Sequence, residues 1–165
     1  MIMQFIKVAD KSQICHLARM AQEIWEEYYP SIISQEQIAY MIDTFQSPAA
    51  IEKQIEEGMR YYLLTHEERA IGYIGFTVET GGSLFLSKIY LARDFRNKGK
   101  GGEAFRFIAE QARKNGCKKI WLTVNKNNKI AIDKYLKIGF TITESVKKDI
   151  GKGFYMDDYV MEYIL

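Results

Sequence analysis

The spacing of apolar residues along the chain predicts a succession of strands and helices. Short runs rich in apolar, β-branched and aromatic residues predict strands, whereas apolar residues three or four positions apart predict helices with one buried face. The predicted strands cover residues 3–8, 60–65, 70–78, 84–91, 119–124, 140–146 and 154–164. The predicted helices cover residues 12–28, 34–45, a piece between 47 and 58, 101–115 and 128–138.

Signals at the ends of these segments support the assignment. Asp10 or Ser12 can cap the first helix, and Pro30 lies just beyond its end. Ser34 begins a capping-box pattern, and Pro48 followed by Gly58 is the usual order of these residues around a helix. No repeat, linker or low-complexity stretch interrupts the chain. The pattern therefore predicts a single α/β domain over residues 1–165, with helices packed on a mixed sheet.

Composition narrows the class of protein. The 165 residues, 47% of them hydrophobic, suit one domain with one core, and the net charge of +2 is too small to indicate binding of nucleic acid or of a membrane. No apolar run approaches the roughly 20 residues that span a bilayer, and residues 1–7 lack the pattern of a secretory leader. Cys15 and Cys117 show no metal-like or redox spacing, and His16 and His66 are isolated, so no metal site is expected. These features favour a cytoplasmic protein.

Residues 84–104 contain the clearest candidate for a ligand site. A buried strand, 84–91, runs into a short basic loop with three glycines, and a helix begins near Gly101. The unpaired N–H groups at the start of a helix bind phosphate without any particular side chain, and glycine lets the backbone approach an anion closely. We therefore predict a pyrophosphate site. Its candidate residues are Arg96, Asn97, Lys98, Gly99, Lys100, Gly101 and Gly102.

Three types of phosphate-binding loop fit this position to different degrees. The kinase and ATPase loop requires Gly-Lys-Ser/Thr, but Gly102 and Glu103 follow Gly101. The dinucleotide fingerprint is met in its relaxed form, Gly-x-Gly-x-x-Ala, beginning at Gly99. No carboxylate follows the strand at 120–124 to bind a ribose, however.

The third type, Arg/Gln-x-x-Gly-x-Gly/Ala, matches residues 96–101 directly after a strand. A second segment, 128–140, matches Asn-x-x-Ala-x-x-x-Tyr-x-x-x-Gly-Phe at every diagnostic position. With both segments in the expected order, the chain resembles the Gcn5-related N-acetyltransferases (the GNAT superfamily), whose loop wraps the pyrophosphate of coenzyme A. The N-terminal helices look most like those of the bacterial spermidine and spermine acetyltransferases.

The resemblance implies an α/β, GNAT-type acyl-CoA N-acyltransferase fold. Such a fold has a mixed, mostly antiparallel twisted sheet flanked by helices, with a splayed pair of central strands. The opened edge would leave Ile89, Tyr90 and Leu91 to pair with the pantetheine arm of acetyl-CoA, and Asn128 and Ala131 would contact that arm. The implied co-substrate is acetyl-CoA, and no metal is implied.

Tyr135 is the predicted catalytic residue. Asn128, Ala131 and Tyr135 lie at positions i, i+3 and i+7 of one helix and therefore share a face. A phenol, with an ordinary pKa near 10, stays protonated at pH 7 and can donate a proton to a departing thiolate. The alternative is an ordinary core stripe made with Ile132 and Leu136, which is the better interpretation when the loop is left out of account.

The general base cannot be transferred from the family. Several members, including the polyamine type, carry a glutamate on the central strand, where this chain has Phe85 and Ser87. The remaining candidates are Glu79, Glu26, Glu27, Tyr73 and an ordered water. Residues 156–159 can also place carboxylates near an amine, but a solvated turn is the preferred interpretation.

The sequence thus predicts an acetyl-CoA-dependent N-acetyltransferase that transfers the acetyl group directly to a primary amine of a small molecule. A polyamine is one acceptor of this kind. A non-catalytic acyl-CoA-binding or sensor module is the alternative, allowed by the absent strand glutamate, and a nucleotide-dependent oxidoreductase is a third. The sequence leaves the acceptor and the oligomeric state open, so a homodimer remains compatible with it.

Overall fold

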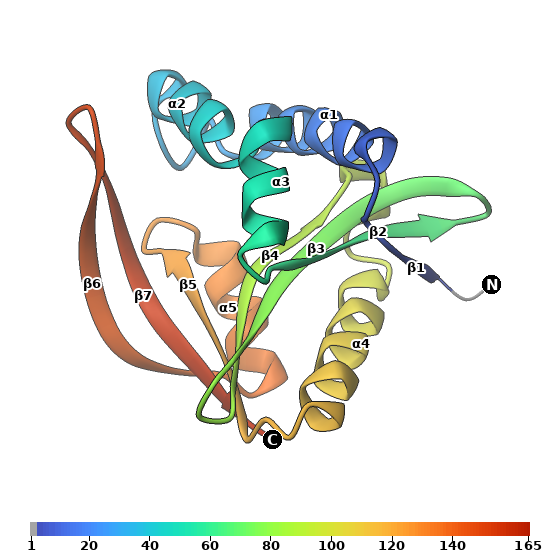
Figure 1. The fold of residues 1–165 in the computed structure, drawn as a ribbon. Helices are drawn as coiled ribbons and strands as arrows, with labels where there is room; N and C mark the ends of the chain where they lie inside the picture. Colours follow the sequence, from blue (N-terminus) through green and yellow to red (C-terminus); the bar gives the residue numbers. More distant parts are fainter. Residues whose placement is uncertain (1–2) are drawn as a thin grey trace.

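The computed structural model describes residues 3–165 as a seven-stranded sheet flanked by five α-helices (Figure 1). The strands are β1 (Gln4–Lys7), β2 (Arg60–His66), β3 (Arg69–Glu79), β4 (Ser83–Leu91), β5 (Lys119–Asn125), β6 (Thr141–Gly151) and β7 (Phe154–Ile164). The helices are α1 (Lys11–Tyr28), α2 (Gln35–Phe45), α3 (Pro48–Glu56), α4 (Lys100–Lys114) and α5 (Lys129–Ile138), with a short 3₁₀ turn at Arg93–Phe95. The strand order is β1-β2-β3-β4-β5-β7-β6.

All strand pairs are antiparallel except β4 and β5, which run parallel. Helices α1 to α3 cover one face of the sheet, and α4 and α5 lie on the other (Figure 1). We call these the α1 face and the α4 face. The predicted α/β class, the mixed and mostly antiparallel sheet and the flanking helices are confirmed. Within residues 3–165, no helix is long and apolar enough to cross a membrane.

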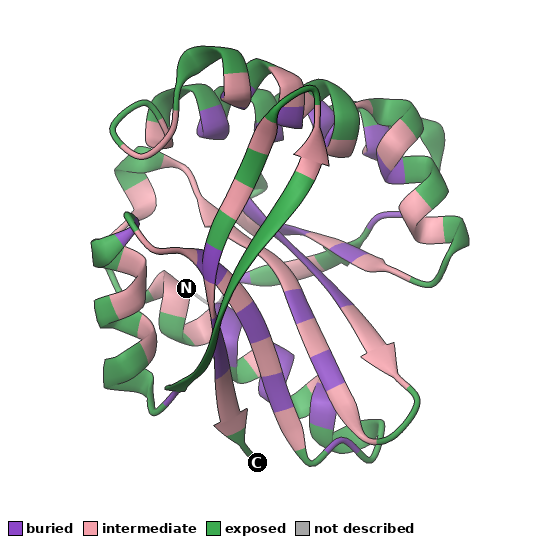
Figure 2. Ribbon diagram, turned by 90° about the vertical axis from the view of Figure 1, so that its left-hand side faces the viewer, coloured by how far each residue is buried: buried purple, intermediate pink, exposed green. Residues whose placement is uncertain are grey.

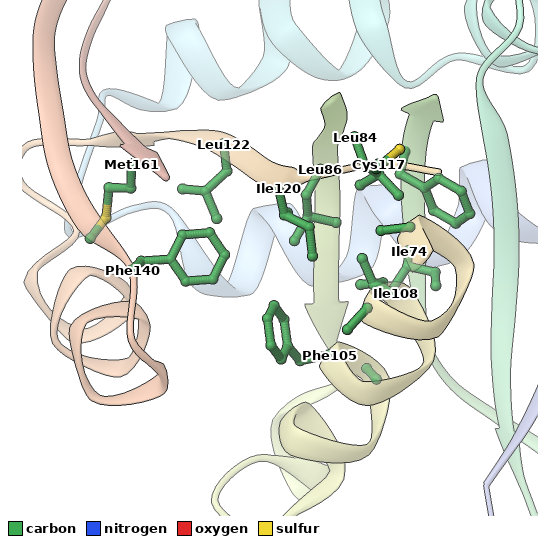
Figure 3. Close-up of a cluster of buried hydrophobic side chains, with 14 of the residues drawn as sticks. Ile74, Leu84, Leu86, Phe105, Ile108, Cys117, Ile120, Leu122, Phe140 and Met161 are labelled. Atoms are coloured by element: carbon green, nitrogen blue, oxygen red, sulfur yellow. The ribbon is translucent and has the colours of Figure 1, made fainter. Parts of the chain in front are cut away.

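The α4 face carries the larger apolar core. Alternate residues of β3, β4 and β5 point toward the inner side of α4, and Phe140 and Met161 extend the cluster toward α5 and β7 (Figure 3). Helix α4 contributes five buried residues spaced as the sequence pattern requires: Ala104, Phe105, Ile108, Ala109 and Ala112. Burial of this stripe fixes α4, and with it the preceding loop, against the end of β4.

The core on the α1 face contains a buried chain of polar side chains. Trp25 Nε1 donates a hydrogen bond to the Tyr73 hydroxyl at 2.9 Å, and that hydroxyl donates to Gln46 Oε1 at 2.7 Å. Gln46 Nε2 donates in turn to the Tyr61 hydroxyl at 3.1 Å. Gln46 is only 1% exposed, so each of these groups depends on its protein partner rather than on water. The network ties α1 and the α2–α3 connection to β2 and β3.

Sequence and structure differ mainly in the C-terminal hairpin. Strand β6 continues to Gly151, five residues beyond the predicted end at 146. Nearly all of its residues are exposed on both faces, so no apolar alternation marks the strand (Figure 2). The interpretation of residues 156–159 as a solvated turn was wrong, because they lie inside β7 and pair with β6 in register. Asp158 among them is buried.

The central strands β4 and β5 separate after a short contact. They pair only at Ser83–Lys119, Leu84–Ile120 and Phe85–Trp121. Beyond these positions β4 stays paired with β3, and β5 stays paired with β7. A register shift between Gly75 and Phe76 of β3 marks an irregularity in β4 next to Ser87, where the two strands part. The expected splayed pair is therefore present.

Replacing Gln46 tests the polar network. In Gln46→Leu, the hydroxyls of Tyr73 and Tyr61 each lose one of their two hydrogen-bond partners, so the free energy of unfolding should fall by about 1–3 kcal/mol. Urea denaturation followed by circular dichroism measures this change.

The matched control is Gln22→Leu on the exposed side of α1, where the side chain bonds only Glu26. That variant should change the free energy of unfolding by no more than about 0.5 kcal/mol. Equal effects of the two substitutions would contradict a structural role for the network.

Candidate functional site

The gap between β4 and β5 is the centre of the candidate site. After Phe85, the edge of β4 that faces β5 has no strand partner among residues 3–165. A strand edge of this kind presents backbone N–H and C=O groups to an extended polar ligand, which can add to the sheet as a further strand would. Ile89, Tyr90 and Leu91 lie on this edge, at the positions that the sequence predicted. The Leu91 carbonyl accepts a hydrogen bond from Arg96 Nε at 3.0 Å.

The glycine-rich loop lies at the end of this gap. Asn97 and Gly99 have φ values of 61° and 79°, so the chain turns sharply before α4 begins at Lys100. Gly99 is the N-cap and offers no side chain to the first N–H groups of α4. A Cβ added at Gly99 or Gly101 would meet no atom within 4 Å. The start of α4 is thus an uncovered helix N-terminus suited to an anion.

The basic residues of the loop have different surroundings. Arg96 pairs with Glu27 at 2.7 Å and lies over the Tyr28 ring, with 5.0 Å between its Cζ atom and the ring centroid. Lys100 contacts Glu103 at 3.9 Å, whereas Lys98 is exposed. The Arg96 guanidinium therefore connects the loop to the end of α1, a role that sequence reasoning did not predict.

Helix α5 contributes the residues of the second motif. Asn128 is the N-cap and is 7% exposed; its Oδ1 accepts hydrogen bonds from the Ala131 N–H at 3.3 Å and from the Tyr28 hydroxyl at 2.7 Å. Ala131 and Tyr135 follow on the same side of the helix, and both pack against the α4-face core. The Asn128 side chain thus caps α5 and also connects this helix to the end of α1.

Four tyrosines surround the gap. The hydroxyls of Tyr29, the C-cap of α1, and of Tyr90 on β4 share a hydrogen bond of 2.7 Å. Burial raises the pKa of the Tyr135 hydroxyl well above its ordinary value, and the phenol groups of Tyr29 and Tyr28 raise that pKa further. The Tyr135 hydroxyl is therefore protonated at pH 7. The sequence predicted Tyr135, but the gathering of Tyr28, Tyr29 and Tyr90 around it depends on the tertiary structure.

Most candidates for a general base are occupied by other contacts. Glu79 Oε1 accepts a hydrogen bond from Trp121 Nε1 at 2.6 Å, and Trp121 stacks on Phe85 with ring centroids 4.3 Å apart. Glu27 is paired with Arg96. Tyr73 is fully buried and bonded to its neighbours on the α1 face. These contacts hold the three side chains in structural roles.

Two charged residues that lie near the gap were not identified from the sequence. Lys88 was not considered, and Asp158 was assigned to a solvated turn. Asp158 on β7 is 5% exposed, and burial, followed by the charge of Asp157, raises its pKa to about 6. Lys88 on β4 donates a hydrogen bond to Ser87 Oγ at 2.7 Å, and burial lowers its pKa to about 8. Side chains alternate between the two faces of a strand, and in β7 Asp158 occupies an inward position between Met156 and Val160. This alternation in residues 154–164 could have indicated that Asp158 is buried.

Relatives of known family share part of the sequence. YobR, an uncharacterized N-acetyltransferase of Bacillus subtilis (strain 168), is 38% identical over 72 residues, which are 44% of this chain and 28% of the relative. The thialysine N-epsilon-acetyltransferase of Sus scrofa is 33% identical over 67 residues, which are 41% of this chain and 39% of the relative. The matched region thus spans well under half the length of these relatives.

Solved structures share the whole fold. The PaiA N-acetyltransferase of Thermoplasma acidophilum, solved in complex with coenzyme A, superposes with a TM-score of 0.82 and 20% identity over 100% of both chains. A GCN5-related N-acetyltransferase from Rhodopseudomonas palustris superposes with a TM-score of 0.81 and 14% sequence identity, and the match covers 100% of this chain and 99% of the other. The sequence itself matches the Acetyltransferase (GNAT) family over residues 17–140. With the splayed strands and the glycine-rich loop in place, this match identifies the chain as a member of the GNAT acetyltransferase family.

Proposed function

We propose that the protein is an acetyl-CoA-dependent N-acetyltransferase whose acceptor is a primary amine of a small molecule. The observation that carries this proposal is the joint position of two features: an uncovered helix N-terminus at Gly99–Gly102 and an unpaired strand edge leading away from it. Coenzyme A has the same order of groups, a pyrophosphate followed by an amide-rich arm. The coenzyme A complex of the PaiA relative supports this assignment.

The proposed coenzyme contacts follow from the geometry. Backbone N–H groups at Gly99–Gly102 would bind the pyrophosphate, because the first turn of α4 has no other partner for them. The edge of β4 at Ile89–Leu91 would pair with the pantetheine amides. Ala131 is small enough to leave room for the arm beside α5, and Asn128 would bind one of its polar groups. Asn128 would then exchange its contact with Tyr28 for one with the coenzyme.

The proposed chemistry is direct transfer in a ternary complex. A neutral amine attacks the thioester carbonyl, and a backbone N–H of the opened β4 edge polarises that carbonyl. As the carbon–sulfur bond breaks, the Tyr135 hydroxyl donates its proton to the thiolate. A raised pKa suits this role, because the hydroxyl stays protonated until the sulfur accepts the proton.

The charges near the gap bear on the acceptor. A polyamine agrees with the likeness to the spermidine and spermine type, and Asp158 supplies a buried negative charge for a cationic amine. Lys88 favours a second class, amines that also carry a carboxylate, because its ammonium lies on the α1 face with no acidic partner among residues 3–165. Assaying both classes with one thiol-release assay decides between them.

A charge at Gly101 tests the loop. Gly101→Glu adds a side chain where a Cβ meets no other atom, so the fold should be retained, while the carboxylate repels a diphosphate. We expect the dissociation constant for coenzyme A, measured by calorimetry, to rise at least about tenfold. Gln111→Glu, which makes the same charge change farther along α4, should leave it within about twofold. Unchanged affinity in Gly101→Glu would contradict the loop assignment.

Removal of one hydroxyl tests Tyr135. Tyr135→Phe keeps the ring that packs against Phe140 but removes the proton donor, so kcat should fall by about 10²–10⁴-fold with coenzyme A affinity unchanged. Steady-state kinetics and calorimetry measure the two quantities. Tyr163→Phe, whose ring also packs against Phe140, is the matched control and should keep its activity. An unaltered kcat in Tyr135→Phe would remove this residue from the mechanism.

Substitution of Lys88 tests the class of acceptor. If the acceptor carries a carboxylate, Lys88→Met should reduce kcat/KM for amino acids by on the order of tenfold. The same substitution should raise kcat/KM for spermidine or leave it unchanged, because one repelling charge is gone. An equal loss for both acceptors would show that Lys88 does not select between them.

A further inference from the structure

Strand β7 holds a carboxylate that the contacts described above leave without a role. Asp158 is 5% exposed, yet among residues 3–165 no group donates a hydrogen bond to its carboxylate. The nearby Lys126 ammonium is paired at 2.9 Å with the neighbouring Asp157. A carboxylate that is held mostly inside the molecule and has no protein partner is available to bind a ligand.

The Asp158 carboxylate is covered but not sealed. Every fully enclosed side-chain nitrogen or oxygen within residues 3–165 has a hydrogen-bond partner. The Asp158 oxygens have none, so they must keep some contact with accessible space. The side chain is therefore held inside the molecule while its oxygens remain open to a small ligand.

The register of β7 places Asp158 beside the gap. Asp158 lies directly opposite Asn125, the last residue of β5, and two residues from Val160, which lies opposite Thr123. Residues that face each other across antiparallel strands share a side of the sheet. Met156, which points to the same side as Asp158, packs against the core of the α1 face. Asp158 therefore stands on the α1 face, next to the part of β5 that β4 has left.

The surroundings of Tyr29 place Asp158 close to the other side of the gap as well. The charge of Asp158 contributes to the raised pKa of Tyr29, whose hydroxyl is bonded to Tyr90 on β4. Tyr135 packs against the core of the opposite, α4 face. A thioester held along β4 would thus have a carboxylate on one side and a phenol on the other.

We propose that Asp158 is the proton acceptor for the attacking amine; this inference rests on the proposed acetyl transfer. The nitrogen lone pair forms the carbon–nitrogen bond as the carbon–sulfur bond breaks, and Asp158 takes the proton that leaves the nitrogen. Tyr135 gives its proton to the thiolate, so one proton enters and one leaves the reacting atoms. Proton exchange with water then restores the Asp158 carboxylate and the Tyr135 hydroxyl.

Several titratable groups face Asp158 and must be considered in any pH experiment. Asp157 raises its pKa and Lys126 lowers it, while Tyr29 approaches it from α1. On β6, Glu144 and Lys148 lie opposite Val160 and Met156 and so share its side of the sheet. The largest cause of the raised pKa remains burial of the carboxylate itself.

The pKa of about 6 sets the sign of the pH dependence. The base is active when ionised, so kcat/KM calculated for the neutral form of the amine should fall by about tenfold per pH unit below pH 6 and lose this dependence above it. Stability follows the opposite trend. Because folding raises the pKa of this carboxyl from 3.8, its ionised form destabilises the fold above about pH 6, and this effect disappears below about pH 4.

The test compares Asp158→Asn with Asp157→Asn, since both remove one negative charge from neighbouring positions. In Asp158→Asn, kcat/KM for the amine should fall about 100-fold or more and the acidic limb near pH 6 should vanish, with coenzyme A affinity unchanged. Its melting temperature at pH 8 should exceed that of the wild type, and the difference should close by pH 4. Asp157→Asn should keep the activity and an acidic limb, moved to lower pH because the charge of Asp157 raises the pKa of Asp158.

The outcomes separate this inference from the proposed function. If the wild-type protein releases no thiol from acetyl-CoA with any amine, the proposed acetyltransferase function is wrong. Wild-type activity combined with an Asp158→Asn variant that keeps more than a third of kcat/KM and an unchanged acidic limb would overturn only the role of Asp158. A higher melting temperature together with lost activity would support the proposal, because a merely structural carboxylate would not produce both.

Discussion

The divergence of two parallel strands is the constraint on which the rest of this structure depends. Strands β4 and β5 share three residue pairs and then separate, because each is held by an antiparallel neighbour on its outer edge. Continued pairing would satisfy the backbone groups of β4 and close the sheet. The separation leaves those groups available at the point where α4, α5 and α1 converge. A ligand with regularly spaced amides can take the place of the missing strand contacts.

Separation of the strands is supported from both faces. On the α4 face, apolar packing of α4 fixes the glycine-rich loop at the end of β4. On the α1 face, the end of α1 contacts three other parts of the site: Glu27 pairs with Arg96, Tyr28 with Asn128, and Tyr29 with Tyr90. Helix α1 is thereby connected to the loop, to α5 and to β4. A change in the length or direction of α1 would move all three contacts together.

Much of the fold could be predicted from the sequence because most elements carry a local signal. Buried stripes on α1 and α4 follow the helical period, and Asp10, Ser34 and Ser47 cap their helices through hydrogen bonds within the next three residues. Strand β6 could not be delimited in this way, since its residues are exposed on both sides. The sequence likewise could not show which candidate general bases are available, because the hydrogen-bond partners of Glu79 and Glu27 lie 42 and 69 positions away in the chain.

By itself, the sequence determined the order of the elements, the glycine-rich loop and the family, because these depend on residues close together in the chain. It also indicated Tyr135, since this residue lies about one helical turn after Ala131 and two turns after Asn128, on the same face of one helix. Only the tertiary structure decided which charges remain available at the gap between β4 and β5. Burial and long-range pairing engage Glu27 and Glu79 and leave the Asp158 carboxylate without a partner, and neither effect can be read from neighbouring residues.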